Sequence, residues 1–184
     1  MQFRGQDQMR TRNPKNRTGK AFSLVELVIV IVIIGVIAAI AIPRVSRGAK
    51  GADESALRSN LAILRNAIEL YASEHGGVFP GAAGDGTNSA GSEAAFTNQL
   101  LKYSDANGAV SDTKGGAFLY GPYLRKQIPP VPVGINRGKN TVKVGNTGPA
   151  VGGDTGWVYN YTTGEIIANS DANDESGNKT YDQY

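Results

Sequence analysis

The side chains that most often carry out chemistry in proteins are scarce in this chain of 184 residues. It has a single histidine, His75, and no cysteine, so zinc, thiol and Ser-His-Asp chemistry all lack their parts. The phosphate-binding pattern Gly-x-x-x-x-Gly-Lys-Ser/Thr is also missing from the sequence. We therefore predict that the protein is not an enzyme.

An acidic stretch near the C-terminus has the donor spacing of a calcium loop. Oxygen-bearing residues occupy its first, third, fifth and twelfth positions, which are Asp171, Asn173, Glu175 and Asp182. Calcium loops between two helices use that spacing. Against such a site, the glycine comes one place late, Lys179 lies inside the loop, and neither flank has a helical pattern. A solvated acidic tail is the favoured interpretation, and calcium is the only cofactor that the sequence suggests.

One further carboxylate, Glu26, lies inside an apolar stretch of which it is the only charge. This stretch runs from Phe22 to Ile42, and a helix of that length covers about 31 Å, close to the ~30 Å hydrocarbon core of a bilayer. We favour a transmembrane helix over a buried core helix or a strand, because ordinary strands are much shorter. An unpaired carboxylate at mid-bilayer depth costs about 2.5 to 3.5 kcal/mol, so Glu26 should pair with a cation or reach the membrane surface.

The residues around Glu26 resemble the processing site of type IV pilins and type II secretion pseudopilins. The run Phe22-Ser-Leu-Val-Glu26 matches the first five mature residues of that family. The resemblance implies that a prepilin peptidase cuts between Ala21 and Phe22, and that the new amine of Phe22 is then methylated. The family prefers glycine directly before the cut, where this chain has Ala21.

The resemblance also implies that the protein assembles through this segment. The freed amine of Phe22, with a usual pKa of about 8, is a cation that Glu26 of a neighbouring subunit can pair with. The alternative is that Glu26 lies at the cytoplasmic interface and is solvated. In related filaments the segment between such residues as Gly35 and Pro43 is flexible, and an ordinary kink of a membrane helix fits the sequence equally well.

Residues 1–21 form the expected cytoplasmic leader. They contain six basic residues and one acidic residue, so removing their net charge of +5 from the chain's +3 leaves −2. The mature chain therefore offers no basis for binding nucleic acid. The basic leader places the N-terminus in the cytoplasm and the C-terminal part outside the inner membrane. A cleaved secretory signal is the rival interpretation, but the apolar run is too long for one.

Beyond the apolar stretch, the hydrophobic period becomes that of an amphipathic helix over residues 44–75. Gly76 and Gly77 should end this helix. The apolar residues of the stripe recur at spacings of three and four: Leu57, Leu61, Leu64, Ile68 and Tyr71.

The remaining residues, 76–184, are rich in glycine and predict one small domain with long loops. Ser92 should cap a short helix over 93–103, and 104–116 should be a polar turn. Strands are expected at 141–144, 157–161 and 165–168, the last two as a hairpin. Trp157, Tyr159 and Tyr161 alternate onto one face, the expected contact for the long helix.

The predicted fold class is α+β, with a long N-terminal helix, half transmembrane and half amphipathic, packed on a small C-terminal antiparallel sheet. The expected layout is a leader at 1–21, an assembly helix at 22–43, an amphipathic helix at 44–75 and a periplasmic domain at 76–184. The predicted function is that of a structural subunit which polymerises through its N-terminal helix into a type II secretion pseudopilus. Residues 118–134 partly resemble a loop of major pseudopilins, and the lack of cysteine favours that branch.

Two alternatives remain open on the sequence. The first is a type IV pilin of a surface filament for adhesion, motility or DNA uptake, and the second is an unprocessed single-pass anchor with a binding domain. The partners implied for a pilin-like subunit are a prepilin peptidase and methyltransferase, identical and related subunits, the inner membrane, and a secretion or pilus assembly machinery.

Overall fold

The computed structural model describes residues 22–184, without the side chains of residue 43 and residues 45–47. The expected leader, 1–21, lies outside the described residues. The chain divides into two units, Met1–Pro43 and Arg44–Tyr184. Helix α1, Leu24–Glu74, contributes to both, so each part of it is described with its own unit.

The part of α1 in the second unit is amphipathic, as its period predicted. The five residues of the predicted stripe, from Leu57 to Tyr71, are almost completely buried in the hydrophobic core. The helix ends where expected, because Gly76 and Gly77 adopt positive φ angles of 65° and 85°. The amide of Gly77 donates to the carbonyl of Ala72 at 2.8 Å, which satisfies a carbonyl that the helix end would otherwise leave unpaired.

Helix α2, Glu93–Leu101, begins at the predicted cap. The hydroxyl of Ser92 accepts from the amide of Ala95 at 3.1 Å. The helix ends two residues earlier than predicted because Tyr103 belongs to strand β1, Tyr103–Ser104, which pairs with β2, Val110–Ser111, in an antiparallel ribbon. The prediction of a polar turn over 104–116 was therefore wrong at Ser104, Val110 and Ser111.

The second sheet has three strands in the order β3, β4 and β5, which span Val142–Gly145, Trp157–Asn160 and Ile166–Ala168. Strands β4 and β5 form the predicted antiparallel hairpin. Strand β3 runs parallel to β4, with Val142 opposite Trp157, so the sheet is mixed and not purely antiparallel. The connection 146–156 makes this possible, since about a dozen residues can carry the chain back to the same end of the sheet.

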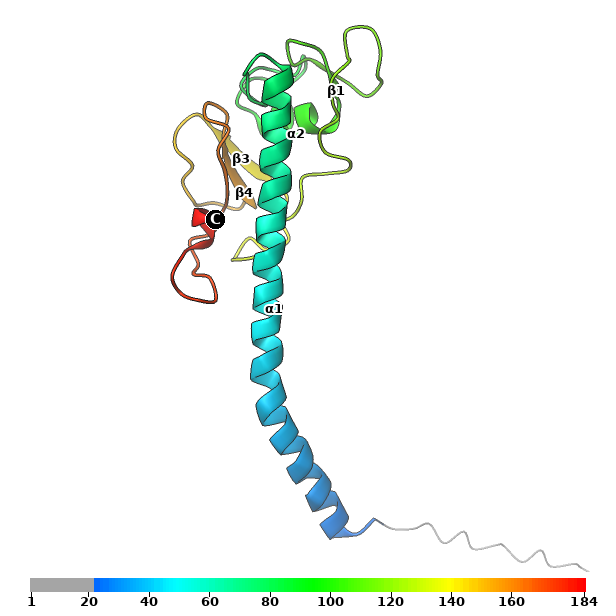
Figure 1. Ribbon diagram of the computed structural model, residues 1–184, viewed down its shortest axis with the longest axis vertical. Coiled ribbons are helices and arrows are strands. Elements are labelled where there is room, and N and C mark those ends of the chain that lie inside the picture. Colours follow the sequence, from blue (N-terminus) through cyan, green and yellow to red (C-terminus); the bar gives the residue numbers. More distant parts are fainter. Residues whose placement is uncertain (1–21) are drawn as a thin grey trace, which may run out of the picture. The chain divides into compact units, whose positions relative to one another are not determined.

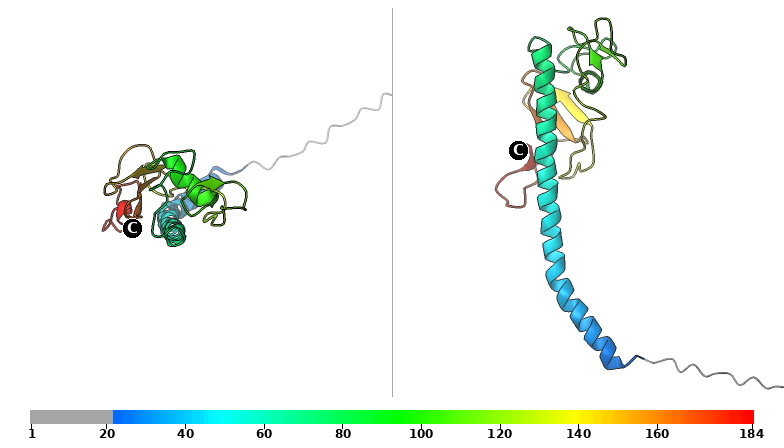
Figure 2. Two further views of the ribbon diagram at one scale, coloured as in Figure 1. Left: turned by 90° about the horizontal axis from the view of Figure 1, so that it is seen from above. Right: turned by 45° about the vertical axis from the view of Figure 1, so that its right-hand side comes forward.

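The core of the second unit lies between α1 and the sheet, beside which α1 runs in both ribbon views (Figures 1 and 2). Trp157 and Tyr159 are buried there as predicted, and Tyr161 packs at the margin. Both buried rings direct their polar groups to loop carbonyls: Trp157 Nε1 donates to Pro129 at 2.8 Å, and the Tyr159 hydroxyl donates to Pro80 at 3.0 Å. The loops are thus fixed by the same aromatic residues that fill the core.

The predicted α+β class is confirmed: a long apolar N-terminal helix is followed by short helices and small sheets. The chain closes with the 3-10 helix η1, Tyr181–Gln183, which contacts β5. Tyr181 brings its ring into the core. The C-terminal end of the chain is therefore part of the packed domain.

Candidate functional site

The candidate processing and assembly site begins at Phe22, directly before α1. The Phe22 side chain is 74% exposed, and the helix starts two residues later. The carbonyl of Ser23 accepts from the amide of Leu27 at 3.2 Å, which closes the first turn. Ala21, on the other side of the predicted cut, lies outside the described residues.

Glu26 lies in the first turn of α1. A carboxylate is favoured there, because the unpaired amides at a helix start carry partial positive charge. Among the described residues, Glu26 takes part in no salt bridge. Glu26 therefore places a negative charge close to Phe22 in the sequence. No cation from residues 22–184 forms a salt bridge with it.

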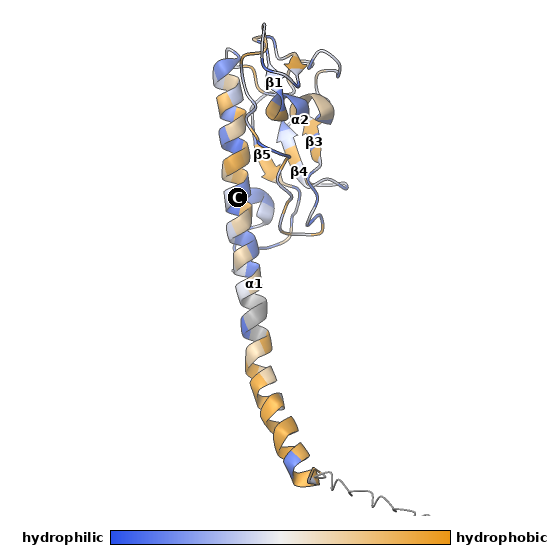
Figure 3. Ribbon diagram, turned by 90° about the vertical axis from the view of Figure 1, so that its right-hand side faces the viewer, coloured by the Kyte–Doolittle hydropathy of each residue, from blue (hydrophilic) through white to orange (hydrophobic). Residues whose placement is uncertain are grey.

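The segment from Leu24 to Ile42 is apolar on every side. It is the one helical stretch of the described residues that is long and apolar enough to cross a membrane. Figure 3 shows this part of α1 coloured as hydrophobic almost throughout, and its side chains are nearly all exposed. A helix that is hydrophobic all round needs a cover of lipid or of other helices, so this surface is consistent with anchoring in a membrane.

Gly35 and Pro43 both lie within the continuous helix α1. Apart from its own helix backbone, a Cβ added at Gly35 would meet no atom of the described residues within 4 Å, so no close packing among those residues requires glycine there. The expectation that these two residues bound a flexible segment stays a prediction.

A family description, the prokaryotic N-terminal methylation motif, matches residues 16–42 of the chain. The match covers the predicted cleavage site, Glu26 and the whole apolar segment. The chain carries the methylation motif of pilin-like proteins. No curated protein matches the chain, and no solved structure matches it either.

The motif is one that pilin-like structural subunits carry, and it covers residues 16–42 of this chain. A structural role is in line with the scarcity of catalytic side chains in the sequence. In general, the motif implies processing by a prepilin peptidase and assembly with pilin subunits. Because it is common to pilins and pseudopilins, it does not assign the chain to one of these branches.

The four calcium candidates lie in and beside the C-terminal loop. Asp171, Asn173 and Glu175 are exposed and Asp182 is half-buried. Asn173 forms a backbone bridge with Thr180. Within residues 22–184, no three His, Cys, Asp or Glu side chains come together in a group that could hold a metal. Calcium binding stays a prediction that these positions do not by themselves support.

Asp174, which was not among the candidates, organises this loop. Its carboxylate accepts from the Ser176 hydroxyl at 2.8 Å, the Asn178 amide at 3.2 Å and the Tyr184 hydroxyl at 3.0 Å. These bonds, led by the one from Ser176, lower the pKa of Asp174. Hydrogen bonds to the charged carboxylate of Asp174 therefore stabilise the fold of this loop.

His75 has a structural environment. Its ring stacks on Tyr71 with centroids 3.8 Å apart, and Nδ1 lies 2.8 Å from the Tyr71 carbonyl, which can only accept. Nδ1 must therefore carry the hydrogen, so in the neutral ring Nε2 accepts from the Ser104 hydroxyl at 3.1 Å. Both ring nitrogens of His75 thus have hydrogen-bond partners. Burial, with a smaller contribution from the charge of Asp105, raises the pKa of the neighbouring Tyr71 hydroxyl. These contacts give His75 a structural role at the end of α1.

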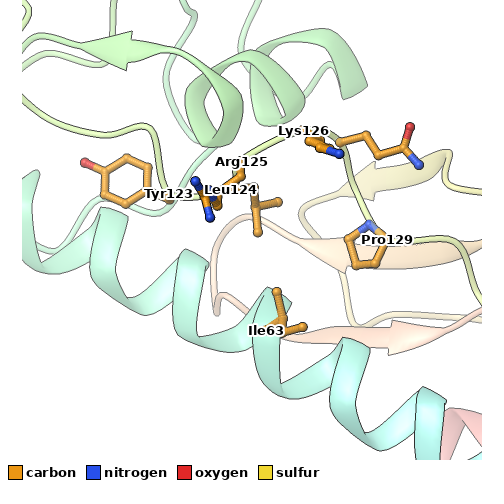
Figure 4. A pocket seen from close by; sticks show the side chains of 7 residues that line it. Ile63, Tyr123, Leu124, Arg125, Lys126 and Pro129 are labelled. Atoms are coloured by element: carbon orange, nitrogen blue, oxygen red, sulfur yellow. The ribbon is translucent and has the colours of Figure 1, made fainter.

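The structure also contains a groove that the sequence gave no reason to expect. It has a volume of about 690 Å³ and lies between α1 and the loop 123–129. We call it the Arg125 groove, and Figure 4 shows its lining side chains. They are Ile63, Tyr123, Leu124, Arg125, Lys126, Gln127 and Pro129. The only sequence signal was that Ile63 is a large apolar residue outside the buried stripe.

Proposed function

We propose that the chain is a subunit of a type II secretion pseudopilus. In this proposal the leader 1–21 is cut off between Ala21 and Phe22, the Phe22 amine is methylated, and the subunit polymerises through residues 22–43. The observation that carries the proposal is the continuity of the methylation motif with an apolar helix exposed on every side.

The same apolar surface serves first as an anchor and then as an assembly surface. In the membrane, lipid covers the segment Leu24–Ile42, and in a filament the equivalent helices of other subunits would cover it. Little hydrophobic free energy is lost in the exchange, because both environments exclude water. Packing and polar contacts between helices therefore determine the register of assembly.

Glu26 and the freed amine of Phe22 supply such a polar contact. Each is costly alone in an apolar environment, and pairing them between two subunits compensates part of both costs. A subunit shifted along the filament would leave both charges unpaired. The pair would thus select one register among several that apolar packing alone permits.

The pseudopilus branch is supported by the domain that follows the helix. The chain has no cysteine, so a core of α1, the sheet and the proline-rich loop stabilises this domain without a disulfide. Leu124, Ile128, Val131 and Val133 of the segment 118–134 are buried in that core, which gives the partial resemblance to a pseudopilin loop a structural role. In this layout the domain lies in the periplasm and the N-terminus in the cytoplasm.

A deletion of the gene tests the assignment to a secretion system. The proposal expects loss of exoprotein secretion with the exoproteins retained in the periplasm, and restoration by the wild-type chain. Surface filaments that disappear in the deletion strain while secretion stays normal would contradict the proposal and assign the chain to the type IV pilins. Full-length monomers that retain residues 1–21 would instead indicate a simple membrane anchor.

A further inference from the structure

The Arg125 groove combines an apolar floor with a cationic rim. Ile63 is 47% exposed on α1, and Leu124 closes the floor at 6% exposure. Arg125 and Lys126 are exposed on the rim, and neither forms a salt bridge among the described residues. The carboxylate of Glu74 accepts from the hydroxyl of Tyr123, another lining residue, at 2.6 Å. The groove therefore suits an occupant that is acidic and partly apolar.

The C-terminal loop of the same chain has the complementary charge. In residues 171–175, which we call the acidic loop, three of five side chains are carboxylates and none is basic. Asp171 and Glu175 are exposed and form no salt bridge within residues 22–184. Ala172, exposed between them, adds a small apolar surface.

The acidic loop is held in place before it meets any partner. The backbone amide of Glu175 donates to Glu54 on α1 at 2.6 Å, and Asp174 is tied to Tyr184. These contacts use the backbone of Glu175 and leave its carboxylate free. A loop that is ordered in advance loses less conformational entropy on docking.

The groove and the acidic loop lie on different sides of α1. In Figures 1 and 2 the loop at 123–127 and the C-terminal segment follow opposite flanks of the helix within the second unit. The two surfaces therefore cannot meet within one molecule. Contact between unlike surfaces of identical subunits is heterologous, and it extends into an open helical array when its rotation does not close a ring.

We propose that the acidic loop of a second copy of this chain docks in the Arg125 groove, with Arg125 and Lys126 facing Asp171 and Glu175. The inference rests on the proposed polymerisation and adds a second contact, made by the domains outside the membrane. The charges orient the subunits, and the apolar floor around Ile63 gains from exclusion of water.

Disulfide trapping tests this contact in a chain that has no cysteine of its own. One copy carries Lys126→Cys and a co-expressed, differently tagged copy carries Glu175→Cys, both full length and assembled in the native membrane. The proposal predicts a mixed disulfide dimer in the filament fraction when both variants are present and not with either alone. The Glu175 substitution keeps the backbone amide that binds Glu54, so the loop should stay in place.

Glu165→Cys is the matched control, because Glu165 is an exposed carboxylate in the turn between β4 and β5. Filaments that form without the Lys126–Glu175 dimer would overturn the proposal, as would equal trapping through Glu165→Cys. Trapping of a different protein by Lys126→Cys, without the dimer, would also overturn it. Absence of filaments from wild-type cells would instead contradict the proposed function, so the two failures are distinguishable.

Charge reversal gives an independent measurement. Arg125→Glu with Lys126→Glu should reduce filament yield by about tenfold, because like charges then face each other across the contact. Adding Asp171→Lys and Glu175→Lys to the same chain should restore a large part of the yield. Unchanged yield in the first variant, or no restoration in the second, would contradict the docking arrangement.

Discussion

Oε1 of Glu54 lies 2.6 Å from the backbone nitrogen of Glu175 and accepts its hydrogen. Glu54 is only 9% exposed, and its other oxygen lies 4.0 Å from Arg58. Residues far apart in the sequence are thus joined, and α1 holds the C-terminal loop in a chain without disulfides. This contact fixes a loop that would otherwise be free at the surface of the second unit.

Glu54→Ala should loosen the C-terminal loop. The substitution leaves the Glu175 amide without its acceptor, so we expect the free energy of unfolding to fall by about 1 to 3 kcal/mol. Hydrogen exchange at the Glu175 amide should also become faster. Glu54→Gln, which keeps a carbonyl acceptor, should have a smaller effect, and equal effects of the two variants would contradict the account.

Leu64→Ala and Ile63→Ala compare two neighbouring residues of α1. Leu64 is 0% exposed in the core, so its truncation should lower the free energy of unfolding by about 2 to 5 kcal/mol. Ile63 faces the groove and is about half exposed, so its truncation should cost less than about 1 kcal/mol. Chemical denaturation of the detergent-solubilised protein measures both free energies of unfolding. A larger loss of stability for Ile63→Ala than for Leu64→Ala would contradict the assignment of Leu64 to the core and of Ile63 to the groove.

Asp85 should make stability depend on pH in the acid range. Burial acts to raise the pKa of this carboxyl, but hydrogen bonds outweigh it and lower the pKa from 3.8 to about 2. The donors are the amide of Asn88 at 2.6 Å, the amide of Thr87 at 2.9 Å, and the side chains of Asn98 and Asn88 at 2.7 and 2.8 Å.

The sign follows from the lowered pKa. The stabilisation is fully present above pH 3.8 and is lost as the pH falls through about 2; it amounts to on the order of 2 kcal/mol. Asp85→Asn should therefore flatten the loss of stability between these pH values. Asp112→Asn, at an exposed carboxylate, is the control, and an equally flattened profile there would contradict the assignment to Asp85.

The sequence predicted those elements whose signals are local. Each of these signals depends on residues that are close neighbours along a helix. Three of them were found in the structure: the apolar stripe from Leu57 to Tyr71, the helix end at Gly76-Gly77 and the Ser92 cap. The hairpin between β4 and β5 was predicted for the same reason, because turn residues and alternation lie side by side in the chain.

Features that depend on distant parts of the chain were not predicted. The parallel pairing of Val142 with Trp157 is decided by the path of a long connection, which has no periodicity. The Arg125 groove exists because one apolar residue of α1, Ile63, meets a loop that follows it by some sixty positions. The apolar segment Leu24–Ile42 could be predicted from the sequence because its hydrophobicity is continuous along the chain and does not depend on contacts with distant residues.

Glu26→Ala should separate anchoring from assembly. Removing the only charge of an apolar segment does not weaken its partition into the membrane, so the membrane-bound amount should be unchanged. Filament yield should fall strongly, because the amine of Phe22 loses its partner in the next subunit. Ser23→Ala is the matched control beside it, and a normal filament yield from Glu26→Ala would contradict the pairing.

The central claim is that the chain becomes an assembly subunit through processing at Phe22. Intact-mass and N-terminal analysis of the protein purified from its native membrane tests it most directly. The account predicts a chain that begins with N-methylated Phe22 and lacks residues 1–21. A chain that still begins near Met1, in cells whose prepilin peptidase is active, would contradict the account.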